Sequence, residues 1–188
     1  MGWQIDSTHS QVTFSVRHMM VSTVKGQFKV LSGVLEIDEQ HPERSWVEAQ
    51  VEAASIDTRD QQRDAHLCSA DFFDVANYPT ITFKSTKVEP LGYIEYRVTG
   101  NLTMHGVTKE VVFDAQYSGQ LKDLSGLQRA GLSARATINR TDFGLNWNRA
   151  LEAGGVLVAE KVTIEIDLEV VQQVIHPTAS PAEAGVAR

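Results

Sequence analysis

Histidines are the most versatile chemical groups in this 188-residue chain, because an imidazole can bind a metal ion or move a proton near neutral pH. The six are His9, His18, His41, His66, His105 and His176. None of them stands two or four residues from another, so the local ligand spacing that usually marks a zinc site is missing. A metal site would need ligands from distant segments, and the sequence predicts no metal.

Ser7, His9 and Asp6 provide the residue types of a nucleophile, a base and an orienting acid, respectively. Sequence neighbours in a strand point to opposite faces, so we do not expect these three to form a triad. The chain contains no Walker A loop and no G-x-S-x-G, H-E-x-x-H or CxxC motif. We therefore predict a protein that is not an enzyme and that has no catalytic residues.

Three polar residues each have two interpretations. His18 continues the inward phase of its strand, so it either donates to the polar end of a ligand or is a core histidine bonded to the backbone. His66 lies on a predicted helix, either at the mouth of a site or, as we favour, on a solvated face. Glu160 falls in the inward phase of the last strand, but an unpaired buried carboxylate is costly, which favours a paired residue at a rim.

The elements that position these residues are strands, because apolar residues alternate with polar ones along most of the chain. A change of phase near Leu31 to Gly33 implies a bulge or break there. The alternating segments are Val12–Val16, Gly26–Val30, Leu31–Ile37, Val47–Ala53, Ile81–Ser85, Ile94–Met104, Val111–Tyr117, Ala130–Ile138 and Val156–Val170. Several such strands with one apolar face each predict an all-β fold, and we favour a closed antiparallel barrel around an apolar interior.

The small size of many inward residues favours a ligand cavity over a filled interior, because small side chains leave volume free. These residues are Gly26, Gly33, Ala49, Ala53, Gly100, Ala115, Ala130, Ala134 and Ala136. The residues expected to contact a ligand are Phe14, Val16, His18, Phe28, Val51, Phe83, Val98, Leu102, Phe113, Leu132, Ala134, Val162 and Ile164.

One segment departs from the alternation. Thr58 and Gln61 form a T-x-x-Q capping box, and the run through Leu67 suits a short helix inserted between strands. We predict one domain over residues 1–173. The segment 174–188 is small, polar and proline-containing, and we expect it to be a disordered tail.

Charge and hydropathy exclude several classes of partner. The chain has 17 basic and 24 acidic residues, a net charge of −7, which argues against nucleic acid or an anionic membrane. No stretch is long and apolar enough for a transmembrane helix, and Cys68 is alone, so it forms no internal disulfide. No signal peptide is visible at the start, so we expect a cytoplasmic protein, or a periplasmic one if this is a mature form.

Several blocks of sequence carry a family resemblance. They are Val12–His18, Ser55–Thr58 with Arg63–Leu67, Asp71–Asp74, Tyr78–Phe83, Gly100–Lys109 and Arg140–Leu145. From Trp3 to Val171 the chain resembles the YceI-like family of bacterial polyisoprenoid-binding proteins. The resemblance implies a lipocalin-like extended eight-stranded antiparallel barrel with an isoprenoid chain in its pore, and a homodimer.

The function expected from these observations is to bind, and carry or store, a long-chain lipophilic molecule such as a polyisoprenoid or an isoprenoid quinone. No cofactor is expected beyond that bound lipid. Two alternatives stay open. One is an isomerase-like enzyme acting on an apolar substrate with His18 or Glu160 as its base. The other is a filled barrel that acts as a stress or interaction protein.

Overall fold

The computed structural model describes residues 2–173, and antiparallel strands dominate this part of the chain. The strands are β1 (Gly2–Ile5), β2 (Gln11–His18), β3 (Ser22–Phe28), β4 (Leu31–Glu36), β5 (Trp46–Glu52), β6 (Ile56–Asp57), β7 (Thr80–Pro90), β8 (Glu95–Met104), β9 (Val107–Lys122), β10 (Gln128–Asn139) and β11 (Val158–Gln172). The helical elements are α1 (Gln61–Cys68) and the short 3-10 turns η1 (Pro42–Arg44), η2 (Ala53–Ser55) and η3 (Arg140–Phe143). The predicted tail, 174–188, lies outside the described residues.

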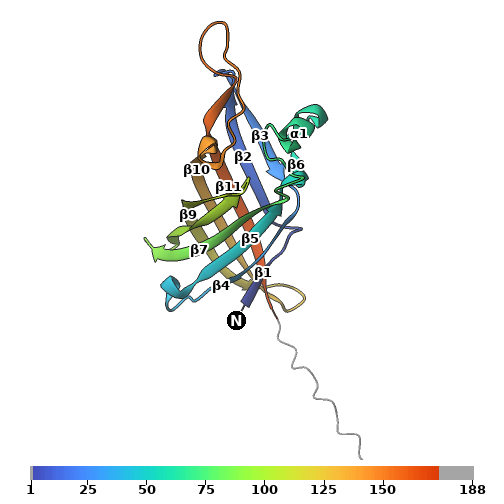
Figure 1. Cartoon of the computed structure of the whole chain (residues 1–188). Helices are drawn as coiled ribbons and strands as arrows, with labels where there is room; N and C mark the ends of the chain where they lie inside the picture. Colours follow the sequence, from blue (N-terminus) through green and yellow to red (C-terminus); the bar gives the residue numbers. More distant parts are fainter. Residues whose placement is uncertain (1, 174–188) are drawn as a thin grey trace, which may run out of the picture.

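Eight strands close into a ring in the order β1, β4, β5, β7, β8, β9, β10 and β11, and β1 pairs with β11 to complete it. β2, β3 and β6 extend the same sheet from the other part of β11 (Figure 1). Closure removes exposed strand edges around the ring. The predicted eight-stranded antiparallel barrel is confirmed.

At two neighbouring positions beside β11, two successive short strands take the place of one long strand. β1 and β2 pair with the same edge of β11, β1 at Val170 to Gln172 and β2 at Val158 to Asp167. The same division is repeated one strand further from β11, because β4 pairs with β1 and β3 pairs with β2. The break between β3 and β4 falls at residues 29–30, directly before the segment where the change of phase predicted it.

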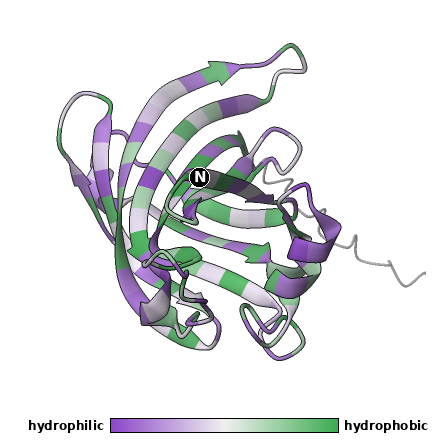
Figure 2. Cartoon of the chain, turned by 90° about the horizontal axis from the view of Figure 1, so that it is seen from above, coloured by the Kyte–Doolittle hydropathy of each residue, from purple (hydrophilic) through white to green (hydrophobic). Residues whose placement is uncertain are grey.

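The alternating pattern becomes a core because every second side chain points into the barrel. Trp3, Phe143 and Val170 are the largest fully buried side chains among the described residues. Burying a large apolar side chain contributes about 1.5–3 kcal/mol, so the shared inward phase is the main source of the barrel's stability. Figure 2 shows apolar and hydrophilic segments alternating along the strands.

The inward glycines do not leave free volume, contrary to the sequence-based interpretation. A Cβ on Gly26 would lie 2.4 Å from Cζ of Phe14, and one on Gly100 would lie 2.5 Å from Cζ of Phe83. Each glycine therefore makes room for a ring from the neighbouring strand. Gly33 is similarly crowded, by the backbone of β5. Aromatic packing explains Gly26 and Gly100, and close approach of the β5 backbone explains Gly33; none of the three provides space for a ligand.

The helical insert forms where the sequence predicts it, but with a different cap. Asp60 is the N-cap residue, and its carboxylate accepts the backbone N–H of Arg63 at 3.0 Å. Thr58 instead donates its hydroxyl to Oδ1 of Asp64 at 2.6 Å and accepts from Nε of Arg63 at 2.8 Å. Thr58 is thus a buried anchor that fixes α1 against the barrel.

Two strand ends differ from the sequence-based expectation. Ile94 was expected to begin an inward face, but it lies in the exposed turn before β8. Val156 was expected in the last strand, but it is exposed and forms an isolated bridge with Ala150. Alternation alone does not distinguish a strand from an extended turn that continues its phase.

Candidate functional site

An apolar cavity of about 260 Å³ lies inside the barrel. Every predicted ligand-contact residue except His18 lines it: Phe14, Val16, Phe28, Val51, Phe83, Val98, Leu102, Phe113, Leu132, Ala134, Val162 and Ile164. Their contact with a ligand stays a prediction. Ala49 and Ala115, two of the small inward residues, also line the cavity.

A smaller hollow of about 90 Å³ continues the interior toward the end near η1. It shares Leu35, Val47 and Val98 with the main cavity, so the two spaces adjoin. At its far side the hydroxyl of Tyr117 donates to Oε1 of Glu39 at 2.7 Å. Burial, followed by the bond to Glu39, raises the pKa of Tyr117, so the phenol stays protonated and can act only as a neutral partner. The interior is therefore elongated, with an apolar middle and a polar group at this end.

Arg140 is the one charged residue in the main cavity wall among the residues that the structure describes. Its side chain is buried, at 4 % exposure, and its guanidinium donates only to backbone carbonyls. Nε contacts the carbonyl of Ala159 at 2.9 Å, Nη1 contacts those of Leu145 and Trp147, and Nη2 contacts that of Val158 at 3.2 Å. Burial lowers the pKa of Arg140, although an arginine remains charged at neutral pH.

Sequence reasoning missed the role of Arg140, yet a signal was present. β10 alternates inward from Ala130 through Leu132, Ala134 and Ile138, and Arg140 occupies the next position of that phase. A charged residue in an inward phase must have several hydrogen-bond partners. The segment 145–159 provides them, so Arg140 holds this segment across one end of the barrel.

An aromatic cluster joins α1 to the same segment. The ring centroid of His66 lies 5.2 Å from that of Phe72 and 4.7 Å from that of Trp147, both in edge-to-face geometry. Nε2 of His66 also lies 2.8 Å from Oδ2 of Asp71. Phe72 in turn lines the cavity. The sequence offered a site mouth or a solvated helix face for His66, and the structure has features of both. The side chain is partly exposed, and it packs against Phe72, which lines the cavity.

His18 and Glu160 do not line the cavity. His18 ends β2 and pairs with Ser22 and Val158, so it sits just beyond the cavity wall. Glu160 lies where β11 shifts register between Val158 and Val162, and it is exposed. Its carboxylate accepts Nδ2 of Asn139 at 3.3 Å, which matches the paired rim residue rather than an inward acid.

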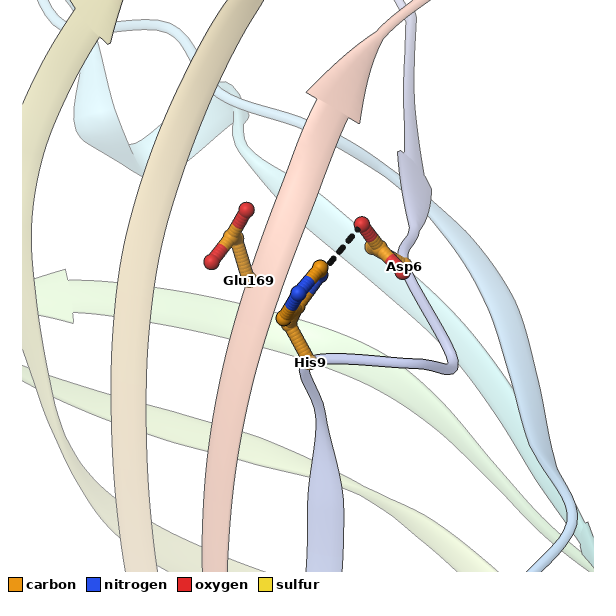
Figure 3. A group of neighbouring side chains, drawn as sticks. All are labelled: Asp6, His9 and Glu169. Atoms are coloured by element: carbon orange, nitrogen blue, oxygen red, sulfur yellow. Dashed lines mark hydrogen bonds and ion pairs between the residues drawn. The ribbon is translucent and has the colours of Figure 1, made fainter. Parts of the chain in front are cut away.

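Asp6, His9 and Glu169 form the one group of three potential metal ligands found among the described residues (Figure 3). Nδ1 of His9 lies 3.0 Å from Oδ2 of Asp6. The group sits where β1 ends, so the long-range convergence that the sequence could not exclude does occur.

A positive charge already occupies this group. Nη1 of Arg129 contacts Asp6 at 2.8 Å and also Glu169, and Nε contacts Asp123 at 2.7 Å. The bonds from His9 and then Arg129 lower the pKa of Asp6, and the bond to Asp6 raises the pKa of His9. The cluster therefore fits an ion-pair network that joins four segments better than it fits a metal site.

Comparison with known proteins places the chain in a family. A family model described as YceI-like domain matches residues 3–170. A UPF0312 protein of Staphylococcus aureus strain N315 is 37 % identical over 165 residues, which cover 87 % of this chain and 94 % of that protein. The chain belongs to the YceI-like family.

Solved structures agree with the fold. The YceI protein of Campylobacter jejuni has a TM-score of 0.71 at 31 % identity and covers 84 % of this chain and 90 % of its own. BcnA of Burkholderia cenocepacia has a TM-score of 0.78 at 24 % identity and covers 88 % and 98 %. A polyisoprenoid-binding domain of Saccharophagus degradans has a TM-score of 0.63 at 17 % identity and covers 91 % and 98 %. The last two show similarity of fold alone.

Proposed function

We propose that this protein binds a long apolar molecule of the isoprenoid kind inside its barrel and carries or stores it. The observation that supports the proposal most strongly is the elongated interior, whose wall is largely apolar and has Arg140 as its one charged residue among the described residues. The name of the Saccharophagus degradans domain, which has the same fold, adds the ligand class to the argument.

The dimensions favour a chain over a bulky ring system. About 260 Å³ is slightly below the roughly 300–1,000 Å³ of pockets that bind compact drug-sized ligands. Each methylene group that leaves water contributes about 0.8 kcal/mol before the costs of ordering. A narrow apolar tube therefore selects by width and by the polar end of the ligand, and length beyond the tube adds little affinity.

Binding explains the interior better than catalysis does. Neither base of the isomerase alternative, His18 or Glu160, lines the cavity. The charged group that does, Arg140, is engaged by four carbonyls, and an arginine is a poor proton acceptor. The cavity also counts against the alternative of a side-chain-filled barrel.

Organic extraction of the purified protein, followed by mass spectrometry, tests the proposal. We expect close to one long-chain lipid per chain, with an isoprenoid, a quinone or a related lipid as the class. Extracts that contain no lipid, together with no uptake of an added polyisoprenoid alcohol, would reject it. The homodimer expected from the family resemblance stays a prediction, which analytical ultracentrifugation can check.

A further inference from the structure

One end of the molecule exposes a group of large apolar side chains beyond the cavity. Met19, Met20 and Val21 form the turn between β2 and β3, and Val156 lies on the neighbouring hairpin 149–157. Met20 is 64 % exposed and Val21 is 76 % exposed. We call these four residues the apolar tip. Figure 1 shows both loops at the top of the molecule.

The two loops of the apolar tip are joined. The backbone N–H of Met19 donates to the carbonyl of Leu157 at 2.7 Å. A Cβ on Gly155 would lie 2.3 Å from the sulfur of Met20, so the methionine packs over a glycine of the neighbouring loop. The two loops therefore present one continuous surface rather than two independent ones.

The backbone of this turn is unusual for the residues it carries. Met19 and Met20 have φ of 50° and 61°, the left-handed region that asparagine and glycine adopt at least cost. Two long apolar side chains thus occupy turn positions at which asparagine or glycine would make the turn more stable and the surface more soluble. Packing explains only part of the choice, because Met19 is 45 % exposed and Met20 is 64 % exposed.

Charge distinguishes this end from the rest of the protein. The β2–β3 hairpin, residues 11–28, contains two basic residues, Arg17 and Lys25, and no acidic one, while the whole chain carries −7. Arg17 lies beneath the turn and donates to the carbonyl of Met20 at 3.1 Å and to Oγ1 of Thr23 at 3.2 Å, neither of them an anion. Arg149 begins the second loop, and Glu152 is the acidic residue of that loop.

Apolar side chains above a basic rim are the features that bind the surface of an anionic bilayer. We propose that the apolar tip docks this protein reversibly on an anionic lipid surface, with Met19, Met20 and Val21 among the headgroups. Among residues 2–173, no helix has the length and hydropathy to cross a bilayer, and the proposed contact is peripheral.

The apolar tip lies beside one end of the cavity, so docking would help the protein to take up a lipid. This role rests on the proposed lipid-carrier function. Val158 lines the cavity and pairs with His18, the residue directly before Met19. Docking would therefore place the Arg140 end of the cavity against the bilayer from which a lipid must be taken. The net charge of −7 is an average over a basic β2–β3 hairpin and an acidic remainder, so it does not prevent this hairpin from contacting an anionic surface.

Co-sedimentation with vesicles tests the docking directly. The wild type should bind vesicles of equal parts phosphatidylglycerol and phosphatidylcholine, more weakly in high salt, and should bind pure phosphatidylcholine less. Met20→Asp with Val21→Asp should reduce binding by roughly tenfold, because it removes apolar contact and adds negative charge. Tyr93→Asp is the matched control: Tyr93 is 99 % exposed but is flanked by Glu89 and Glu95, so binding should not change.

A second variant separates docking from folding. Met19→Asn with Met20→Gly installs the preferred turn sequence, so it should raise Tm while it weakens vesicle binding. Uptake of a polyisoprenoid alcohol from detergent, measured in parallel, tests the carrier function without a bilayer. A wild type that binds neither kind of vesicle, or tip variants that bind vesicles as the wild type does, would overturn the docking proposal. Failed uptake with normal vesicle binding would reject the carrier function alone.

Discussion

Two arginines at opposite ends of β10 hold the barrel together in different ways. Arg129, near the start of the strand, contacts the carboxylates of Asp6, Asp123 and Glu169 and is 23 % exposed. Arg140, directly after the strand, is 4 % exposed and donates only to carbonyls of residues 145–159. The first joins segments at a rim that water reaches, and the second joins segments beside the cavity.

Burial explains why the partners differ. A buried ion pair must compensate the desolvation of two charges, whereas carbonyl dipoles satisfy one buried guanidinium without bringing a second charge out of water. At the exposed rim the desolvation is small, and carboxylates give charge-assisted hydrogen bonds. The pKa of Arg140 is accordingly lowered by burial, and that of Arg129 is raised by its bonds to Asp123, Asp6 and Glu169. The Arg140 end should therefore depend little on salt or pH, and the Arg129 end should depend on both.

The largest expected effect follows from Arg140→Met. The change removes the Arg140 donor from four carbonyls, of which only that of Val158 keeps a side-chain donor, Nδ2 of Asn148. Each unsatisfied buried polar group costs about 1–3 kcal/mol. We expect a loss of stability above about 3 kcal/mol and faster hydrogen exchange in residues 145–159, measured by denaturant unfolding and by exchange mass spectrometry. Arg140→Lys should recover only part, because an ammonium cannot reproduce the planar set of donors. A loss below about 1 kcal/mol would contradict the role given to Arg140.

Ala134→Trp tests whether a ligand occupies the cavity beside the middle of β10, between the two arginines. The indole should fill the space meant for a ligand at a cost of about 1–3 kcal/mol for overpacking. Uptake of a polyisoprenoid alcohol should fall strongly while the barrel remains folded, which circular dichroism can verify. A stable variant with unchanged uptake would place the ligand elsewhere.

Arg129→Met should cost less stability than Arg140→Met, and its effect should shrink as salt is added. Thermal unfolding of both variants at low and high ionic strength is the measurement. An Arg129 effect that does not respond to salt, or that exceeds the Arg140 effect, would contradict the different roles given to the two arginines.

The Arg129 end should also respond to acid. Bonds from Ser125 and then Arg129 lower the pKa of Asp123, and bonds from His9 and then Arg129 lower that of Asp6. A carboxyl with a lowered folded pKa stabilises the protein above its ordinary pKa of 3.8, and this contribution is lost as pH falls through the folded pKa. The difference in Tm between wild type and Arg129→Met should therefore narrow on acidification below about pH 4. A difference that is constant down to pH 2 would contradict the network.

His18→Phe should have the smallest effect. The sequence suggested that His18 meets the polar end of a ligand, but His18 lies outside the cavity wall, next to Val158. We expect competition between a polyisoprenoid alcohol and a plain hydrocarbon to be unchanged in the folded variant. A weakened preference for the alcohol would restore the ligand role of His18.

The sequence predicted the elements better than it predicted what they contact. Strict alternation assigns a face to each residue, so the barrel and most of the cavity wall, such as Phe83 and Leu132, could be read from it. It does not show which side chain lies opposite a given residue: alternation predicts free volume at Gly26 and Gly100, but the rings of Phe14 and Phe83 fill that space. The partners of Arg129 and Arg140 come from segments far along the chain or from irregular backbone, which no local pattern encodes.

Native mass spectrometry of wild type and Ala134→Trp, each incubated with one polyisoprenoid alcohol, shows whether a lipid binds inside the barrel. It counts bound molecules per folded chain and so separates a ligand inside the barrel from lipid that adheres to the surface. We expect one molecule on each wild-type chain and none on Ala134→Trp. Equal occupancy of the two proteins, or no occupancy of either, would contradict the claim that this barrel holds an apolar chain.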